Sequence, residues 1–426
     1  MAPDDDSGCP VLDMTARAPH QQNAELRSAG PAVRVELPGG IIAWSVTRSS
    51  VIRALAGDPR VSRDPRKHWP ALASVPEGWP MGPIAFQRNF FNLYGAEHRS
   101  GRRRLAPSFS PRRVSALRPG IEATTAALVG AFRELRPGEA VDIRRALSLP
   151  LTMTVICDLF GVPADMRPRI GRAMDTLLTT TATTEQMTVS RAEMDVVLAE
   201  LLELKRRSPG PDLASDVAAV STGGETGRSE EESRDTLFLM LGAGYETAVN
   251  LITSAIQALL THPGYLAQVR EGALGWEDVI EETLRYESPV MHIPLRYPLE
   301  DVDLGEGVVI RRGEPILLGF GAAGRDPEVH PDRPDDFDPT RPDKEHLSFG
   351  HGPHFCLGAP LARLEAEVAL DGLFSAYPDS VLDPSGPAPA RVESVIVSGP
   401  SELWIVPTPA AAAPKGKGRV RGCPVR

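Results

Sequence analysis

The sequence predicts a mostly α-helical fold with small β-sheets, built as one globular domain. Between residues 112 and 287, apolar residues recur chiefly at the 3.6-residue spacing of helices, and strand-like runs are in the minority. With 426 residues, 42% of them hydrophobic, the chain can bury a large core. Its prolines and glycines are scattered, so we expect a single domain over residues 30–406. We expect residues 1–29 to be flexible, and the low-complexity, basic residues 407–426 to be disordered.

The individual elements follow in chain order. Two strand-like runs, 33–37 and 41–46, flank Pro38-Gly39-Gly40 and predict a β-hairpin. A second β region is predicted at 300–318, followed by an irregular Pro/Asp-rich stretch at 326–343. Helical periodicity indicates helices within residues 120–135, 145–160, 190–206, 233–261 and 276–286, and in a last segment that begins near Leu357.

The composition argues against several partners and locations. The formal net charge of -10 disfavours nucleic acid, because phosphate-binding surfaces carry a basic excess. The four cysteines form no CxxC pair, which suits a reducing compartment. No stretch reaches the roughly 18 to 20 apolar residues of a membrane span, and the acidic start lacks the apolar core of a signal peptide. We therefore expect a cytoplasmic monomer that contacts neither nucleic acid nor membrane.

Residues 349–358, Phe-Gly-His-Gly-Pro-His-Phe-Cys-Leu-Gly, are the most informative segment of the chain. They place Cys356 at the end of a glycine-rich turn, just before the last predicted helix. Glycines allow backbone N–H groups to approach the sulfur, and the N-terminal end of the following helix stabilises negative charge. A thiolate held in this way is a metal ligand. Cys356 is therefore the predicted metal-binding residue.

A second unusual segment lies within residues 233–261, a helix that is apolar on nearly all sides and should be central and buried. Gly244 costs about 1 kcal/mol relative to alanine in a helix interior, and Glu246 and Thr247 bring polar groups into an apolar setting. Such conflicts are expected at functional sites. The Thr247 hydroxyl can bond back to the Ala243 carbonyl and open the helix ladder into a polar notch. The alternative is a glycine kink that serves packing alone.

Together these segments resemble the cytochrome P450 family of haem-thiolate monooxygenases. Residues 349–358 resemble its haem-binding loop, residues 243–247 its acid-alcohol motif, and Glu282 with Arg285 its ExxR structural pair. The resemblance covers residues 30–406 and implies the mostly helical, triangular single domain, with haem b between the notched helix and the cysteine loop. It implies that Cys356 is the axial protein ligand of the iron. It also implies that Glu246 and Thr247 relay protons for the cleavage of dioxygen.

The resemblance further implies which residues contact the haem. Basic residues hold the two propionates in this family, and the matching positions here are an HxxxR pair, His98 and Arg102, together with Arg296 and His354. The other cofactor-binding positions that the resemblance implies are Ala243, Gly244, Phe349, Gly350, Cys356 and Gly358.

In the family, an arginine directly before a phenylalanine completes the ExxR pair as a triad. This chain departs from that pattern, because Asp336 precedes Phe337. Arg333 and Arg341 lie on either side, and the sequence leaves open which of them closes the triad.

The implied reaction uses dioxygen and electrons that pass from NAD(P)H through a ferredoxin reductase and a ferredoxin, and it hydroxylates or otherwise oxidises a small organic molecule. Clustered arginines at residues 99–113 are interpreted as a docking surface for an acidic ferredoxin, the alternative being a solvated charged face. The predicted substrate is a mid-sized apolar steroid, terpenoid, macrolide or other natural product of secondary metabolism. The positions expected to line its pocket are Phe86, Phe90, Leu178, Val290, His292, Ile293 and Ile396.

Two other functions were weighed against this interpretation. A peroxide-driven member of the family is expected to lack the acid-alcohol pair, and a haem-binding scaffold or sensor is expected to lose the ligand cysteine, yet this chain has both. Two motifs are interpreted as coincidental. Residues 319–324 fit GxGxxG, but residues 325–331 cannot continue the helix that a dinucleotide site needs. A zinc site formed by His346, His351, His354 and Cys356 would have no known zinc spacing.

Overall fold

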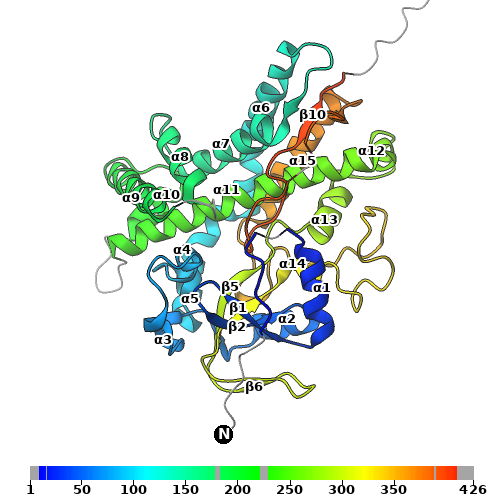
Figure 1. The fold of residues 1–426 in the computed structure, drawn as a ribbon. Helices are drawn as coiled ribbons and strands as arrows, with labels where there is room; N and C mark the ends of the chain where they lie inside the picture. Colours follow the sequence, from blue (N-terminus) through cyan, green and yellow to red (C-terminus); the bar gives the residue numbers. More distant parts are fainter. Residues whose placement is uncertain (1–8, 16, 178–182, 221–228, 388–389, 410–426) are drawn as a thin grey trace, which may run out of the picture.

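The computed structural model describes residues 9–15, 17–177, 183–220, 229–387 and 390–409. Helices form the larger part of the molecule, and the strands of the main sheet gather with the N-terminal residues at one end, whereas β10 lies near the other end (Figure 1). The prediction of a mostly helical fold with small sheets is confirmed. Among the described residues, no helix is both long enough and apolar enough to cross a membrane.

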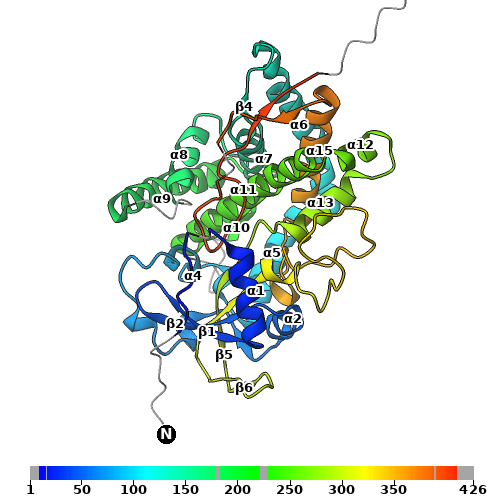
Figure 2. The same cartoon turned by 45° about the vertical axis from the view of Figure 1, so that its right-hand side comes forward.

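The helical part is organised around α11 (Glu230–Thr261), which runs through the middle of the molecule (Figures 1 and 2). Ser229 begins this helix with a capping box, because its hydroxyl accepts from the Glu232 N–H at 3.1 Å while the Glu232 carboxylate accepts from the Ser229 N–H at 3.0 Å. The helices packed around α11 or near it are α5 (Gly95–Leu105), α6 (Pro111–Gly130), α7 (Leu149–Phe160), α8 (Arg167–Leu177), α9 (Thr184–Arg207), α10 (Leu213–Val220), α12 (Pro263–Arg270), α13 (Trp276–Tyr286) and α15 (Ala359–Ala376).

The main sheet has five strands in the order β1-β2-β8-β5-β3. The predicted hairpin is confirmed, since β1 (Val33–Leu37) and β2 (Ile41–Val46) pair antiparallel with Val35 opposite Ala43. The next strand, β8 (Ile316–Leu318), lies parallel to β2 although about 270 residues separate them. The sheet is completed by β5 (Ile293–Pro298) and β3 (Val61–Ser62), which pair antiparallel.

Two smaller sheets complete the strands. One has three strands in the order β4 (Val141–Asp142), β10 (Trp404–Val406) and β9 (Val381–Leu382), and so joins the chain's C-terminal part to the segment before α7. The other is the pair β6 (Val302–Asp303) and β7 (Val309–Ile310), in the predicted second β region. As predicted, residues 326–343 contain neither helix nor strand.

The structure differs from the sequence prediction at the N-terminal side of the domain. Residues 1–29 were expected to be flexible, but Pro19–Ala29 form helix α1. Its Asn23 and Leu26 are buried, and the Asn23 amide donates to Met291 Sδ at 3.2 Å, so tertiary contacts rather than local periodicity hold this helix. Of the predicted C-terminal segment 407–426, residues 410–426 lie outside the described part of the chain.

The remaining short helices lie near the main sheet. They are α2 (Ser49–Gly57), α3 (Pro65–His68), α4 (Gly82–Ala85) and α14 (Phe320–Ala323). The GxGxxG match at residues 319–324 encloses the single turn of α14, and packing explains its last glycine. A Cβ at Gly324 would lie 2.0 Å from the Arg285 carbonyl oxygen. The motif therefore serves a close contact with the end of α13.

Candidate functional site

The loop at residues 349–358 has the geometry expected of a thiolate cradle. Gly350 and Gly352 have φ values of 75° and 70°, which favour glycine. A Cβ at Gly352 would lie 2.9 Å from the Ala56 carbonyl oxygen, so the loop packs directly on α2. The Cys356 N–H donates to the Phe349 carbonyl at 2.8 Å, and α15 begins three residues after the cysteine.

The surroundings of the Cys356 sulfur act on its charge in opposite directions. Burial in the protein raises the pKa of Cys356, whereas the Gly358 and Ala359 N–H groups and the guanidinium groups of Arg102 and Arg363 lower it. On balance, burial outweighs these groups and the pKa of Cys356 is raised. As a residue, Cys356 is solvent-exposed in the polypeptide.

The middle of α11 contains the predicted contact between a hydroxyl and the helix backbone. Thr247 Oγ1 donates to the Ala243 carbonyl at 2.6 Å. Ala243 is exposed although most of α11 is buried, and Thr247 lies on the same helix face four residues later. The helix is assigned without a break from Glu230 to Thr261, so the expected opening of its ladder is not seen.

Packing explains Gly244. A Cβ there would lie 2.6 Å from Ile156 Cδ1, so the glycine allows α7 to approach α11 closely. This is the packing role considered as the alternative for this glycine. It does not extend to Ala243, which is exposed, or to Thr247, which is half-buried.

Glu246 has a charged partner that sequence reasoning missed. Arg144 Nη2 donates to Glu246 Oε1 at 2.6 Å, and the side chains of both residues are 8% exposed. Arg144 Nη1 also donates to Asn250 Oδ1 at 2.7 Å. Glu246 and Asn250 are four residues apart, and together with Ala243 and Thr247 they follow the i, i+3, i+4, i+7 spacing of one helix face. The sequence offers no signal for this contact beyond an arginine beside apolar residues.

A cluster of basic side chains lies on the other side of the cysteine loop. The rings of His98 and His354 stack with their centroids 3.9 Å apart. The strongest charges acting on His354 are those of Arg296, Arg63 and His98, followed by Arg102. Burial and these arginines lower the pKa of His98 to about 4, and burial lowers the pKa of Arg296 to about 10. A buried cationic cluster of this kind suits an anionic ligand.

Arg63 is a member of this cluster that the sequence analysis did not find. Its Nε donates to the Phe91 carbonyl at 3.1 Å, its Nη2 donates to the Pro294 carbonyl at 2.8 Å, and its guanidinium lies 3.7 Å from the Phe91 ring centroid. Two polar atoms in the cluster, His98 Nε2 and Arg296 Nε, are buried without a hydrogen-bond partner among the described residues. They are free to donate to a ligand.

The ExxR pair forms a closed network, and Arg341 completes it. Arg285 Nε and Nη2 donate to the two Glu282 oxygens at 2.7 and 2.8 Å, and both side chains are fully buried. Arg341 Nε donates to Glu282 Oε1 at 3.1 Å. Arg333 instead pairs with Asp338 at 3.1 Å, and its side chain is 57% exposed. The carbonyl of Asp336 accepts from Arg285 at 2.7 Å and from Arg341 at 3.1 Å, so it also joins the two arginines.

The residues predicted to line a substrate pocket have varied surroundings. Phe86 lies among aromatic rings, with its centroid 5.5 Å from that of Trp79, and Phe90 is buried with its ring 6.4 Å from His98. His292 is buried, and its Nδ1 contacts the Val395 carbonyl at 2.9 Å. Val290, Ile293 and Ile396 are half-buried, and Leu178 lies outside the described residues.

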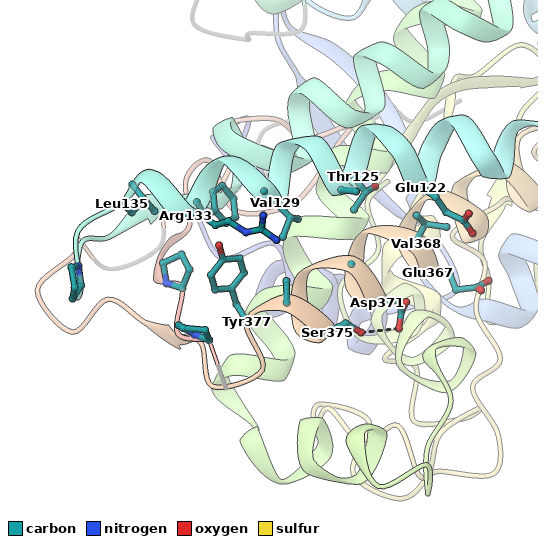
Figure 3. A pocket seen from close by; sticks show the side chains of 18 of the residues that line it. Glu122, Thr125, Val129, Arg133, Leu135, Glu367, Val368, Asp371, Ser375 and Tyr377 are labelled. Carbon is teal, nitrogen blue, oxygen red and sulfur yellow. Dashed lines mark hydrogen bonds between the residues drawn. The ribbon is translucent and has the colours of Figure 1, made fainter. Parts of the chain in front are cut away.

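One cavity lies away from all of these residues. It has a volume of about 880 Å³ between α6 and α15 (Figure 3), and none of the predicted site residues lines it. Its lining mixes acidic and basic side chains, such as Glu122, Glu367 and Arg133. In the described part of the chain, no group of three or more His, Cys, Asp or Glu side chains could hold a metal ion, which leaves the zinc interpretation without support.

Comparisons with known proteins agree with this geometry. The family model "Cytochrome P450" matches residues 276–402. The chain is 40% identical to 2-hydroxy-5-methyl-1-naphthoate 7-hydroxylase of Streptomyces carzinostaticus, over 88% of this chain and 92% of that one, and 38% identical to cytochrome P450 monooxygenase PikC of Streptomyces venezuelae, over 88% and 89%. The structure of CYP154A1 from Streptomyces coelicolor A3(2) superposes with a TM-score of 0.89 and 44% identity, covering 94% of this chain and all of that one.

Proposed function

Because this chain belongs to the cytochrome P450 family, and is therefore a haem-dependent monooxygenase, we propose that it oxidises a mid-sized apolar natural product with electrons delivered by a ferredoxin. The family binds haem b through a cysteine thiolate, and dioxygen, a redox partner and a small organic substrate belong to its reaction. The observation that carries the proposal is Cys356, held before α15 by backbone donors and two arginines.

In this proposal Cys356 would be the protein residue that binds the haem iron. When bound, haem supplies the chemistry that splits dioxygen and transfers one oxygen atom to the substrate, with the thiolate increasing electron density at the iron. The chain's contribution is to lower the cost of an anionic sulfur at a site where burial, on balance, raises the pKa of Cys356. The Gly358 and Ala359 N–H groups and the nearby arginines oppose the cost of burying that charge.

The basic cluster fits the two carboxylates of haem b. Arg63, His98, Arg102, Arg296 and His354 come from four separate parts of the chain, and burial lowers the pKa of the histidines and of Arg296 when no anion is near. Two propionates would supply the missing negative charge, and His98 Nε2 and Arg296 Nε could donate to them. A cluster of cations that burial destabilises by itself is well suited to a dianionic ligand.

Thr247 and Glu246 have different roles in the proposed supply of protons. Thr247 Oγ1 donates a hydrogen bond to the Ala243 carbonyl, so its lone pairs can accept a hydrogen bond from water. The hydroxyl can transfer its proton when its bond to the Ala243 carbonyl opens and a water takes the place of that carbonyl. The Glu246 carboxylate is bound to Arg144, so proton transfer through it requires that ion pair to loosen. We propose that Thr247 positions the water that donates the proton. Glu246 would replace that proton in a slower step.

The substrate class rests on pocket chemistry and on relatives. Half-buried aliphatic residues in the segments around β5 and residues 395–397 favour an apolar molecule. The naphthoate hydroxylase, at 40% identity, is named for a fused-ring aromatic acid, which is largely apolar apart from its carboxylate and hydroxyl. Hydroxylation of a compound of this size is the proposed reaction.

The proposed ferredoxin surface lies on α5 and the start of α6. Arg99, Arg103, Arg104 and Arg112 are exposed, whereas Arg113 is bound to Asp216 at 3.0 Å. These exposed cations, on the helix that carries His98 and at the start of the next helix, would attract an acidic electron carrier. If so, the rate of reduction by ferredoxin should fall steeply as salt rises.

The test begins with the haem-loaded protein. The reduced carbon monoxide complex should show the red-shifted Soret band of thiolate ligation, and Cys356→Ala should remove it. A compound library is then screened for molecules that shift the ferric haem from low to high spin, and each hit is incubated with NAD(P)H, ferredoxin reductase and ferredoxin. An oxygenated product would support the proposal. Turnover with hydrogen peroxide but not with ferredoxin would replace it with a peroxygenase, and a band that survives in Cys356→Ala would refute the ligand.

A further inference from the structure

A second ion cluster, which the proposed mechanism does not use, lies directly behind the cysteine loop. It joins α13, the segment before the loop and α15 through Glu281, His346 and Arg363. Arg363 Nε and Nη2 donate to the two Glu281 oxygens at 2.6 and 2.9 Å, and His346 Nε2 contacts Glu281 Oε2 at 3.1 Å. Glu281 is the neighbour of Glu282, so the same helix carries both this cluster and the structural triad.

The cluster holds its groups in defined positions. The Ser348 N–H donates to His346 Nδ1 at 3.2 Å, so Nδ1 is the acceptor and Nε2 carries the proton that points to Glu281. Burial would raise the pKa of Glu281, but the hydrogen bonds from Arg363 and His346 lower it to about 2. Glu281 is therefore a carboxylate, and it fixes the Arg363 guanidinium with a bidentate pair.

Arg363 is placed where its charge reaches the cysteine. Its guanidinium carbon lies 4.5 Å from the centroid of the Phe349 ring, and the Phe349 carbonyl accepts from the Cys356 N–H at 2.8 Å. Only the Phe349 residue therefore separates the Arg363 guanidinium from the backbone of Cys356, so the charge of Arg363 can act on the sulfur. Arg102 acts on the sulfur in the same direction, but α5 carries it on the other side of the loop.

We propose that Arg363, held in place by Glu281, is a positioning residue that sets the reduction potential of the haem through Cys356; this inference rests on the proposed role of Cys356 as the axial ligand. Reduction adds one electron to the iron, so the thiolate, porphyrin and iron together gain one negative charge. A fixed cation near the sulfur favours the reduced state, and a fixed anion disfavours it. Arg363 should raise the potential, and Glu281 should moderate that effect.

The experiment is a potentiometric titration of the haem-loaded protein and three variants. Arg363→Met should favour the oxidised state by about tenfold, a shift of about 59 mV to lower potential. Glu281→Gln should shift the potential in the opposite direction, because Arg363 then acts without its counter-ion. Arg363→Lys keeps the charge and should stay close to the unchanged protein. Glu367→Gln, on the same helix but paired with Arg118 at the surface, is the matched control and should have no effect.

Two outcomes of the titration would show that Arg363 does not set the reduction potential. If the Arg363→Met and Glu281→Gln potentials coincide with that of the unchanged protein, or if both move in the same direction, the cluster is structural only. The reduced carbon monoxide spectrum of each variant keeps this failure separate from that of the proposed function. A red-shifted Soret band throughout, with unchanged potentials, rejects the role of Arg363 alone. Absence of that band in the unchanged protein rejects thiolate ligation and the inference with it.

Discussion

Glu282 and Glu246 are both buried carboxylates paired with an arginine, but the two sites differ in how completely their polar atoms are satisfied. Arg285 makes five hydrogen bonds with its five N–H donors, two of them to Glu282 and three to backbone carbonyls. Glu282 also accepts from Arg341 and from the Asp338 N–H. We call this site closed, because its hydrogen bonds are complete at Arg285 and both side chains of the pair are fully buried.

The Glu246 site is open by contrast. Arg144 binds both Glu246 and Asn250, but Asn250 Nδ2 has no hydrogen-bond partner among the described residues. One helix turn away, Ala243 is exposed and Thr247 bonds to the backbone. A fully satisfied network can only be broken at a high cost, whereas an incompletely satisfied one can rearrange. The comparison indicates a structural role for the first pair and a functional one for the second.

The largest expected effect comes from breaking the closed pair. Glu282→Ala leaves the fully buried Arg285 without its carboxylate, and removing one partner of such a pair costs about 3 to 5 kcal/mol. We expect this variant to lose most of its folded, haem-binding protein. Haem content and thermal unfolding measure the loss. A variant that keeps the normal haem content and unfolding temperature would show that the network is dispensable.

Breaking the open pair should cost less. Arg144→Met removes the charged hydrogen bonds to Glu246 and Asn250, and we expect a loss of about 1.5 to 3 kcal/mol in the free energy of unfolding. The protein should still fold and bind haem. Denaturant unfolding of Arg144→Met beside Glu282→Ala tests the order. Equal losses in the two variants would remove the distinction between the sites.

His292 is a buried basic group without a carboxylate partner among the described residues, and it should make the stability of the protein depend on pH. Burial lowers the pKa of His292 to about 4, while its unfolded value is about 6.5. Between these values the unfolded chain binds a proton that the folded one does not, so stability falls as pH drops from 6.5 towards 4. At pH 5 this amounts to about 2 kcal/mol.

Unfolding midpoints at pH 7 and pH 5 measure this loss, and His292→Gln should reduce it by about 2 kcal/mol. The same pH dependence in His292→Gln and the unchanged protein would assign the acid sensitivity to other groups.

Within the closed site, the two candidate arginines should be unequal. Arg341→Ala removes a donor to Glu282 and should cost about 1.5 kcal/mol. Arg333→Ala, the matched control, removes a mainly exposed side chain and should cost less than about 1 kcal/mol. Chemical unfolding of the two variants compares them directly. A larger loss for Arg333→Ala would contradict the assignment of Arg341 to the triad.

The smallest effect on stability should come from Thr247→Ala, less than about 0.5 kcal/mol, because only a side chain bond back to the helix is lost. Its effect should instead appear in coupling. More of the electrons consumed should leave as hydrogen peroxide and fewer in product, while Thr247→Ser retains the hydroxyl and the normal ratio. Unchanged coupling in Thr247→Ala would count against the proposed role in proton supply.

Much of this protein could be predicted from local sequence. The hairpin at 33–46, the helix at 276–286 and the irregular stretch at 326–343 follow from short-range patterns, and the structure confirms them. Cys356 before a helix and the bond from Thr247 to Ala243 are also local, because each joins residues within four positions of one another along the chain. The fold class followed from helical periodicity alone.

Contacts between distant parts of the chain required the tertiary structure. Arg144 and Glu246 are 102 residues apart, and Arg341 and Glu282 are 59 apart. Arg63 joins the basic cluster, and α1 is held in place by such contacts as well. No periodicity records which buried carboxylate an arginine will meet, because that depends on how helices pack. The sequence by itself therefore determined the kind of chemistry, and the packing decided which charges surround it.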